Sequence, residues 1–277
     1  MLLNGGIQVK SVEIGTFEEL PKRIRVEDIV LDVGGGCKPL SRANYVLDFL
    51  PWDNKEQAGL YFNDHWPTPH FARESWVQWD LCSHQPWPFK DKQFDFVLCK
   101  QTLEDLRDPV WVCQEMMRVG KGGFIEVPHR VIESIPGIER SRFCGYSHHR
   151  WMCEVSERGI EFIFKHAQLH GYSRFHLSPG LSWNRGARDH TWSEVLDVVE
   201  PVSIVVNRWF RTVNPKYAAA GFFWKDSFHC RERLLIDKGD VEADLMAFKE
   251  RCRELDDIWI WKRTWHGKRI RHQERLL

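Results

Sequence analysis

Short apolar runs separated by polar segments dominate the first half of the chain. The runs lie at about 28–34, 45–50, 76–81, 94–99 and 120–128, and they are rich in Val, Leu, Ile, Phe and Trp. Short continuous apolar runs are typical of strands that are buried on both faces of a parallel sheet. Residues 109–119 instead carry apolar positions at helical spacing, which predicts an amphipathic helix. The pattern therefore predicts an α/β fold.

The polar segments that connect the predicted strands differ in length. The segment between the first two strands is short and contains Pro39, so its helix should be short. Residues 51–75 are rich in Pro, Asn, Asp, His and Trp, and predict a long loop over the cofactor or the substrate entrance. Residues 1–28 have mixed polarity, so we expect them to form some helix and to contribute no catalytic or binding residues.

The second half of the chain is less regular. Residues 129–149 predict irregular structure, followed by a β-hairpin over 151–155 and 160–164. Further predictions are a loop at 171–190, a capped helix at 191–199, a strand at 202–210, another strand within 222–236 and an amphipathic helix at 241–261. The predicted organisation is a core at 1–128, an insertion with the acceptor site at 129–190, and a C-terminal part at 191–277 that completes the fold.

The net charge, the cysteine spacing and the length of the apolar runs argue against several classes of function. The 277 residues contain 39 Lys and Arg and 39 Asp and Glu, and this zero net charge argues against nucleic-acid binding by the chain as a whole. None of the eight cysteines forms a Cys-x-x-Cys pair, which argues against a zinc ribbon and favours a reducing, cytoplasmic setting. No apolar run approaches the roughly 20 residues that span a bilayer, so no membrane span is expected.

A glycine-rich turn follows the first strand. Asp32 is near the end of this strand, and Gly34, Gly35 and Gly36 come directly after it. Three glycines allow backbone amides to approach a ligand closely, and an acid at the end of a buried strand needs a partner or a ligand. A dinucleotide motif would require a third glycine where this chain has Pro39, so that interpretation is excluded.

Acids also end the second and third strands, at Asp48 and Asp80. In nucleotide-binding α/β folds, an acid at the tip of the second strand accepts hydrogen bonds from ribose hydroxyls. A carboxylate can accept from both hydroxyls at once. Each acid alone is compatible with a structural role, but three acids on successive strands beside a glycine turn favour an adenosyl cofactor.

The Asp-x-Gly-x-Gly pattern resembles motif I of the class I S-adenosylmethionine-dependent methyltransferases. The segments 86–99, 103–109 and 120–128 are similar to further segments of the small-molecule branch of that family, in the correct order. The family's Leu-x-His-Leu-x-Asp-Pro turn has Asp105 at the usual His position here. The resemblance covers about residues 29–128. It implies a Rossmann-like sheet with helices on both faces and an elaborated C-terminal half.

The resemblance also implies S-adenosylmethionine as cofactor and S-adenosylhomocysteine as product. In the family, the acid at the position of Asp80 contacts the adenine amino group, and the next residue, Leu81 here, reads the ring through its backbone. The residues expected to bind the cofactor are Asp32, Gly34, Gly35, Gly36, Asp48, Phe49, Asp80, Leu81, Lys100 and Gln101.

Methyl transfer from a sulfonium is a direct displacement, so the protein must align the acceptor and exclude water. A hydroxyl or amine acceptor can also use a base, for which His148, His149 and Glu104 are candidates. Adjacent residues of an extended segment point in opposite directions, so at most one of the two histidines should face a site. A structural role is left open for all three. The residues expected to contact the acceptor are Asp105, Tyr146, Arg150 and Trp151.

The expected acceptor is a small molecule, such as a sugar or a secondary metabolite, methylated on oxygen or nitrogen. Two alternatives are an RNA methyltransferase that uses the basic tail at 262–277, and a non-catalytic partner subunit that binds the cofactor. A metal site is not expected, because His166 and His170 have no acid between them and no third ligand. A homodimer is left open.

Overall fold

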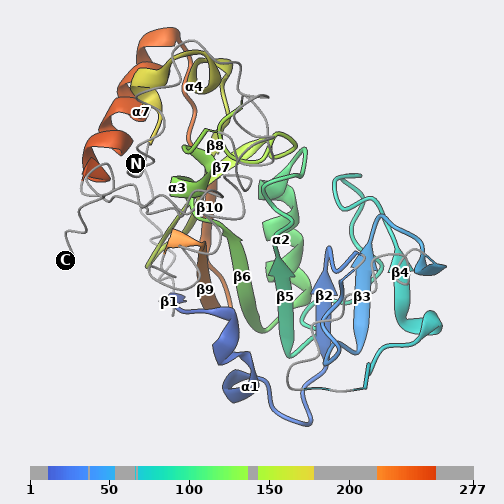
Figure 1. Cartoon of the computed structure of the whole chain (residues 1–277). Helices are drawn as coiled ribbons and strands as arrows, with labels where there is room; N and C mark the ends of the chain where they lie inside the picture. Colours follow the sequence, from blue (N-terminus) through green and yellow to red (C-terminus); the bar gives the residue numbers. More distant parts are fainter. Residues whose placement is uncertain are drawn as a thin grey trace, which may run out of the picture. The chain divides into compact units, whose positions relative to one another are not determined.

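The computed structural model describes residues 12–36, 38–53, 66, 68–136, 143–177 and 217–253. The chain forms two compact units (Figure 1). The sheet unit comprises Met1–Val127, Cys153–Ile163 and Ala220–Arg233, and the helical unit comprises Pro128–Met152, Phe164–Ala219 and Leu234–Leu277. The three-part organisation expected from the sequence stays a prediction.

The sheet unit contains a seven-stranded sheet with the strand order β1-β9-β6-β5-β2-β3-β4 (Figure 1). The pairs β6·β5, β5·β2, β2·β3 and β3·β4 are parallel, and β1 is antiparallel to β9. The strands are β1 Val12–Ile14, β2 Val30–Val33, β3 Tyr45–Asp48, β4 Trp76–Gln78, β5 Phe96–Lys100, β6 Gly122–Pro128 and β9 Ala219–Lys225. The predicted α/β fold with a parallel sheet is confirmed.

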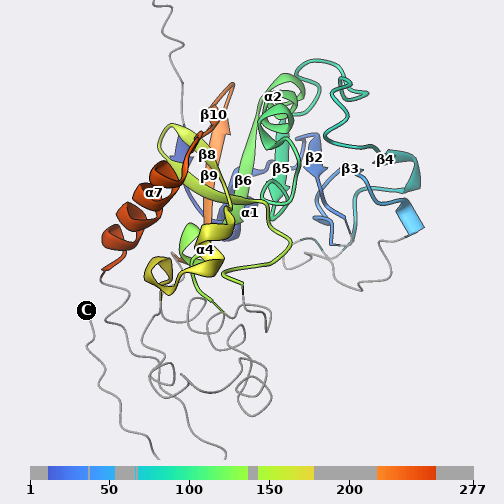
Figure 2. The same ribbon diagram turned by 90° about the horizontal axis from the view of Figure 1, so that it is seen from above.

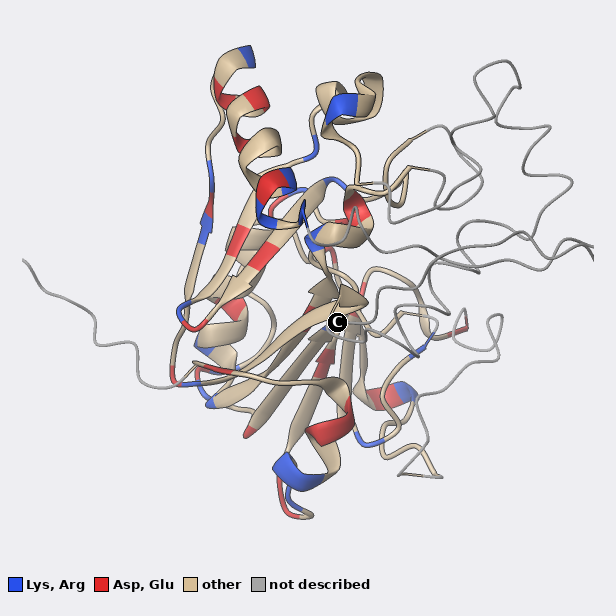
Figure 3. Ribbon diagram, turned by 60° about the vertical axis from the view of Figure 1, so that its left-hand side comes forward, with Lys and Arg blue, Asp and Glu red and all other residues tan. Residues whose placement is uncertain are grey.

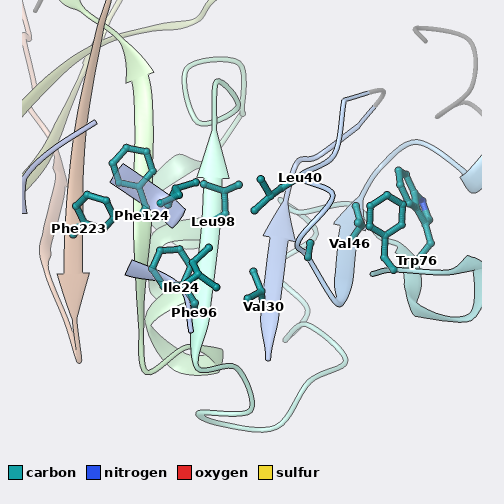
Figure 4. Packing of buried hydrophobic residues seen from close by; sticks show 12 residues of the cluster. Ile24, Val30, Leu40, Val46, Trp76, Phe96, Leu98, Phe124 and Phe223 are labelled. Carbon is teal, nitrogen blue, oxygen red and sulfur yellow. The ribbon is translucent and has the colours of Figure 1, made fainter. Parts of the chain in front are cut away.

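Both faces of the central strands are buried, which explains their continuous apolar runs. On one face, a hydrophobic cluster joins alternate residues of neighbouring strands, among them Val30, Leu98 and Phe124, with Ile24 after helix α1 (Leu20–Arg23) (Figure 4). The opposite face carries Val97 and is covered by α2, as Figure 2 shows.

Helix α2 spans Pro109–Val119, the residues that the apolar spacing predicts. The Asp108 side chain caps it by accepting a hydrogen bond from the Trp111 amide at 3.0 Å. Pro109 occupies the first helical turn, where no amide donor is needed. Gly120 ends the helix against Val97, because a Cβ at Gly120 would lie 2.5 Å from the Val97 side chain.

Some predicted elements differ from those observed. The described residues between β2 and β3 form turns instead of the expected short helix, because the Asp32 carboxylate binds the Leu40 amide at 2.7 Å. Strand β4 ends at Gln78, so Asp80 lies two residues beyond it. The lead-in contains 3₁₀-helix η1 (Phe17–Glu19) and α1, as predicted, and also the unexpected strand β1.

A second sheet has the strand order β10-β8-β7. Strands β7 (Trp151–Ser156) and β8 (Gly159–Phe164) form the predicted hairpin. Strand β10 (His229–Glu232) pairs in parallel with β8, so the strand expected within 222–236 is in fact two strands, β9 and β10. The long loop at 51–75 contains the 3₁₀-helix η3 (Arg73–Ser75) in its described part.

The helical unit contains α3 (Arg130–Glu133), α4 (Ala167–Gly171), η5 (Ser173–Phe175) and α7 (Lys238–Arg251). The predicted helix at 241–261 therefore begins three residues earlier, where Asp237 caps it through the Asp240 amide. Helix α7 joins the rest of the unit through the buried ion pair of Arg130 with Asp244. The predicted helix at 191–199, the strand at 202–210 and the basic tail at 262–277 lie outside the described residues.

Figure 3 shows acidic and basic residues interspersed over the described elements, as the zero net charge leads one to expect. All seven cysteines within the described residues are free thiols. None of the helices in the described part of the chain combines the length and the apolar character needed to cross a lipid bilayer.

Candidate functional site

The glycine turn after β2 has the tight geometry expected from the sequence. Gly34 and Gly36 have φ angles of 73° and 49°, a region that favours glycine. Gly34 also lies against Thr102, since a Cβ at Gly34 would be 2.3 Å from the Thr102 methyl carbon. Gly35 packs on Asp32, with its virtual Cβ 2.8 Å from a carboxylate oxygen. Thr102 is a supporting residue that the sequence motifs do not identify.

Asp32 lies inside the turn, and only 3% of the residue is exposed. Burial raises the pKa of Asp32 to about 7, and the hydrogen bond from the Leu40 amide only partly opposes this effect. The nearby charge of Asp48 raises the pKa of Asp32 further. Near neutral pH this carboxyl group therefore exchanges between its neutral and charged forms.

Asp48, the last residue of β3, joins that strand to the glycine turn. Its Oδ2 accepts from the Gly36 amide at 2.8 Å, and its Oδ1 accepts from the Leu50 amide at 2.7 Å. Burial raises the pKa of Asp48. Each carboxylate oxygen keeps a further lone pair that could accept a ribose hydroxyl. The next residue, Phe49, is 68% exposed and offers an apolar surface beside this acid.

Asp80 lies beyond β4 with 49% of its side chain exposed. Its Oδ1 accepts from the Cys82 amide at 2.9 Å, and Arg107 lies 3.6 Å from its Oδ2. Arg107 also donates to the Cys82 carbonyl at 2.6 Å, so it braces the segment that carries Asp80. Leu81 is buried beside it. Arg107 is another residue that the motifs do not identify.

Lys100 ends β5 directly opposite Glu126 of β6, with 3.5 Å between Nζ and Oε1. The Lys100 ammonium also lies 4.5 Å from the centre of the Phe17 ring. Burial lowers the pKa of Lys100 and raises the pKa of Glu126. Gln101 follows with a φ of 51° and donates its amide to the Glu126 carbonyl at 2.8 Å.

Four adjacent parallel strands thus carry ionisable side chains at or near their carboxyl ends, which are Asp48 of β3, Asp32 of β2, Lys100 of β5 and Glu126 of β6. The carboxyl ends of parallel strands form the ligand-binding edge of open α/β sheets. The two left-handed glycines, the acceptor oxygens of Asp48 and the exposed ring of Phe49 fit an adenosyl ligand at this edge.

The two acids after β5 differ in exposure. Glu104 is almost completely buried, whereas Asp105 is half-buried in a turn in which its amide donates to the Thr102 carbonyl at 3.1 Å. A base must reach the proton that it removes. The burial of Glu104 therefore favours a structural role, and the roles of both acids stay predictions.

The histidine pair lies in the helical unit, where His149 is buried and His148 is exposed. The two rings nevertheless lie side by side, with their centres 4.5 Å apart, so the expectation that the two side chains point in opposite directions is wrong. His149 Nδ1 lies 2.8 Å from Glu133 Oε1, and the His149 and Tyr146 ring centres are 4.7 Å apart. Arg150 is exposed and Trp151 is buried.

His166 and His170 have structural surroundings. His166 occupies the N-cap position of α4, and His170 Nδ1 accepts from the Cys144 amide at 3.1 Å. Burial lowers the pKa of His170 to about 4, with a further contribution from the charge of Lys165. His170 is therefore a neutral acceptor that holds residue 144.

Replacing His170 by Asn should reduce the loss of stability in mild acid. The unfolded chain takes up the proton near pH 6.5 and the folded chain only near pH 4, so stability falls as the pH drops through this window. The Asn oxygen can still accept from the Cys144 amide but does not titrate. Urea unfolding at pH 7 and pH 4.5 should show a smaller difference for His170→Asn than for wild type. An equal difference would contradict the neutral-acceptor role.

Residues 52–125 match a family described as a methyltransferase domain. This match confirms the resemblance to S-adenosylmethionine-dependent methyltransferases and supports S-adenosylmethionine as the cofactor. A search of curated proteins found no match.

Three solved structures illustrate the similarity to known proteins. A provisionally described methyltransferase of Bacillus halodurans is 21% identical over 40% of this chain and 50% of its own, with a TM-score of 0.29. The YcgJ protein of Bacillus subtilis is 20% identical over 40% and 49%, with a TM-score of 0.30. The chain thus spans about half the length of these two relatives. A Haloferax volcanii complex of the Trm112 methyltransferase activator with a provisionally described methyltransferase is 16% identical over 76% and 88%, with a TM-score of 0.39.

Proposed function

We propose that this chain, which carries a class I S-adenosylmethionine-dependent methyltransferase domain, transfers a methyl group to an oxygen or nitrogen of a small molecule such as a sugar or a secondary metabolite. The observation that carries the proposal is the edge of the sheet where Asp32, Asp48 and Asp80 lie at or just beyond the ends of three neighbouring strands beside the glycine turn. A sheet built only for stability would gain little from buried carboxylates, because burying a charge is costly.

The cofactor supplies a methyl group that is activated by its bond to a sulfonium. In the proposal, Asp48 accepts hydrogen bonds from the ribose hydroxyls while the Gly36 and Leu50 amides hold it in place. Asp80 accepts from the adenine amino group and is braced by Arg107. Binding the reactants in line supplies much of the rate.

Calorimetric binding of S-adenosylhomocysteine to wild type and to Asp48→Ala tests the ribose contact. We expect micromolar binding by wild type and at least tenfold weaker binding by the variant, a loss of about 1.4 kcal/mol. Asp91→Ala, which removes an exposed acid paired with Arg118, is the matched control and should bind as wild type does.

The 2′-deoxy analogue of the ligand separates a direct contact from a structural effect of Asp48. If Asp48 contacts the ribose, removing the hydroxyl and removing the carboxylate should not have additive effects on affinity. Additive losses would mean that Asp48 acts only by holding the glycine turn. No binding by folded wild-type protein would overturn the proposed function itself.

Transfer of a radiolabelled methyl group identifies the acceptor class. The full chain is incubated with labelled S-adenosylmethionine and, separately, with a panel of sugars, a panel of phenols, a panel of small amines and total RNA. The proposal expects label in one of the three small-molecule panels. Label in RNA would support the RNA methyltransferase alternative, and cofactor binding without any transfer would support the partner-subunit alternative.

A further inference from the structure

Glu126 lies near the carboxyl end of β6, on the same edge of the sheet as the glycine turn. Strand β5 separates β6 from β2, and neighbouring strands are about 4.8 Å apart, so Glu126 lies about 10 Å across the sheet from the end of β2. Glu126 and the glycine turn both belong to the sheet unit. Their arrangement is therefore defined by the sheet itself.

Glu126 is a buried carboxylate with weak contacts. Only 11% of its side chain is exposed. Lys100 Nζ and Gln101 Nε2 each lie 3.5 Å from Glu126 Oε1, which is longer than a normal hydrogen bond. Within the described part of the chain, no group donates a hydrogen bond to Oε2. A buried carboxylate usually has close donors, because burying a charge is costly.

A purely structural role in neutralising Lys100 would favour a close ion pair. The Lys100 ammonium instead lies 3.5 Å from Glu126 Oε1 and 4.5 Å from the centre of the Phe17 ring. Burial raises the pKa of Glu126, and the charge of Lys100 only partly opposes this rise. The carboxylate is therefore incompletely compensated, and a ligand that donates a hydrogen bond to Oε2 would stabilise it.

The proposed cofactor contacts follow the strand order along the same edge. Asp80 lies beyond β4, Asp48 ends β3 and the glycine turn follows β2. In the proposed function, Asp80 binds the adenine and Asp48 binds the ribose, so the cofactor runs along the edge in the direction of β2 and β5. The sulfonium is attached to the ribose on the side away from the adenine. The next carboxylate in this direction is Glu126.

We propose that Glu126 is a catalytic residue, whose Oε2 takes the proton of the hydroxyl or amino group that receives the methyl group. The inference rests on the proposed function and requires an acceptor with an O–H or N–H bond. As the acceptor oxygen or nitrogen bonds to the methyl carbon, the carbon–sulfur bond breaks and its electron pair stays on sulfur. The acceptor proton passes to Glu126 Oε2.

Sinefungin tests the location of Glu126 without a known acceptor. In this analogue of S-adenosylmethionine, a protonated amino group on carbon replaces the methyl group on sulfur. A carboxylate beside the transferred methyl group attracts that charge. We expect calorimetry of the full chain to show at least about tenfold tighter binding of sinefungin than of S-adenosylhomocysteine. Glu126→Gln should remove most of this preference and leave the affinity for S-adenosylhomocysteine unchanged.

Glu27→Gln is the matched control, because it makes the same chemical change at a 68% exposed acid of the sheet unit that pairs with Arg25. It should retain the preference for sinefungin. Equal affinity of wild type for the two ligands, or an unchanged preference in Glu126→Gln, would overturn the inference. Loss of S-adenosylhomocysteine binding in Glu126→Gln would also overturn it, because Glu126 would then support the cofactor site.

Failure of folded wild-type protein to bind S-adenosylhomocysteine would instead count against the proposed function. The failure of the inference and the failure of the proposed function are therefore distinguishable.

Turnover with an acceptor from the transfer assay separates a base from a binding contact. Glu126→Gln retains an acceptor oxygen but cannot take a proton, so kcat should fall by about 100-fold or more, with an unchanged KM for S-adenosylmethionine. Glu126→Asp retains the carboxylate on a shorter side chain and should recover part of this loss. An unchanged kcat in Glu126→Gln would overturn the role of Glu126 as the base.

Discussion

Gly34→Ala should destabilise the protein by about 2 to 4 kcal/mol and abolish measurable binding of S-adenosylhomocysteine. The φ of 73° at Gly34 is costly for any residue with a Cβ, and the new methyl group would also lie 2.3 Å from the Thr102 methyl carbon. Neither problem can be relieved without moving the turn after β2 or the segment after β5. Urea unfolding measures the loss of stability, and calorimetry measures the loss of binding.

Gly171→Ala is the matched control, because a Cβ at Gly171 meets no atom within 4 Å. Its stability should stay close to that of wild type. Combining Gly34→Ala with Thr102→Gly removes the steric conflict but keeps the unfavourable φ, so it should restore only part of the lost binding. If Gly34→Ala alone binds the ligand as tightly as wild type does, the turn is not part of the cofactor site.

The central strands and α2 could be predicted because their determinants are local. Burial on both faces produces continuous apolar runs, and the α2 boundaries follow from the Asp108 cap, Pro109 and Gly120. The strand-end acids could also be predicted as neighbours, since parallel strands bring their carboxyl ends to one edge of the sheet.

Strands β1 and β10 could not be predicted in the same way. Each has three or four residues, most of them partly or fully exposed, so neither has an apolar run. Their strand conformation depends on pairing with β9 and β8, which are distant in the sequence. The prediction of a short helix between β2 and β3 was wrong for a different reason. The Leu40 amide donates to the Asp32 carboxylate, and the described residues of this segment form turns instead.

The candidate site follows the same division between local and long-range determinants. Asp32 and Asp48 could be predicted as site residues because each lies in a strand that the sequence pattern identifies. Glu133 and Lys165 could not be predicted as neighbours, because the contact of Glu133 with His149 spans 16 residues and its contact with Lys165 spans 32 residues. One sequence signal was present, namely that Glu133 is an acid within a short apolar stretch that includes Ile132 and Ile135. An acid in such a stretch needs a buried partner.

Asp32→Asn should stabilise the protein in a pH-dependent manner. Asp32 ionises near pH 3.8 in the unfolded chain but only near pH 7 in the folded chain, so the unfolded state loses its proton first. Wild-type stability should therefore fall as the pH rises from 3.8 to 7. At 1.36 kcal/mol per pKa unit, the gain of the variant over wild type should be about 3 kcal/mol larger at pH 8 than at pH 4.5.

Urea unfolding of both proteins at the two pH values measures this difference. The Asn oxygen can still accept from the Leu40 amide, so the turn itself should be retained. Asp91→Asn makes the same chemical change at an exposed acid and should retain the pH dependence of wild type. A gain that is equal at pH 4.5 and pH 8 would show that burial does not raise the pKa of Asp32. A more stable Asp32→Asn protein with weaker cofactor binding would indicate that this buried carboxylate serves function at the expense of stability.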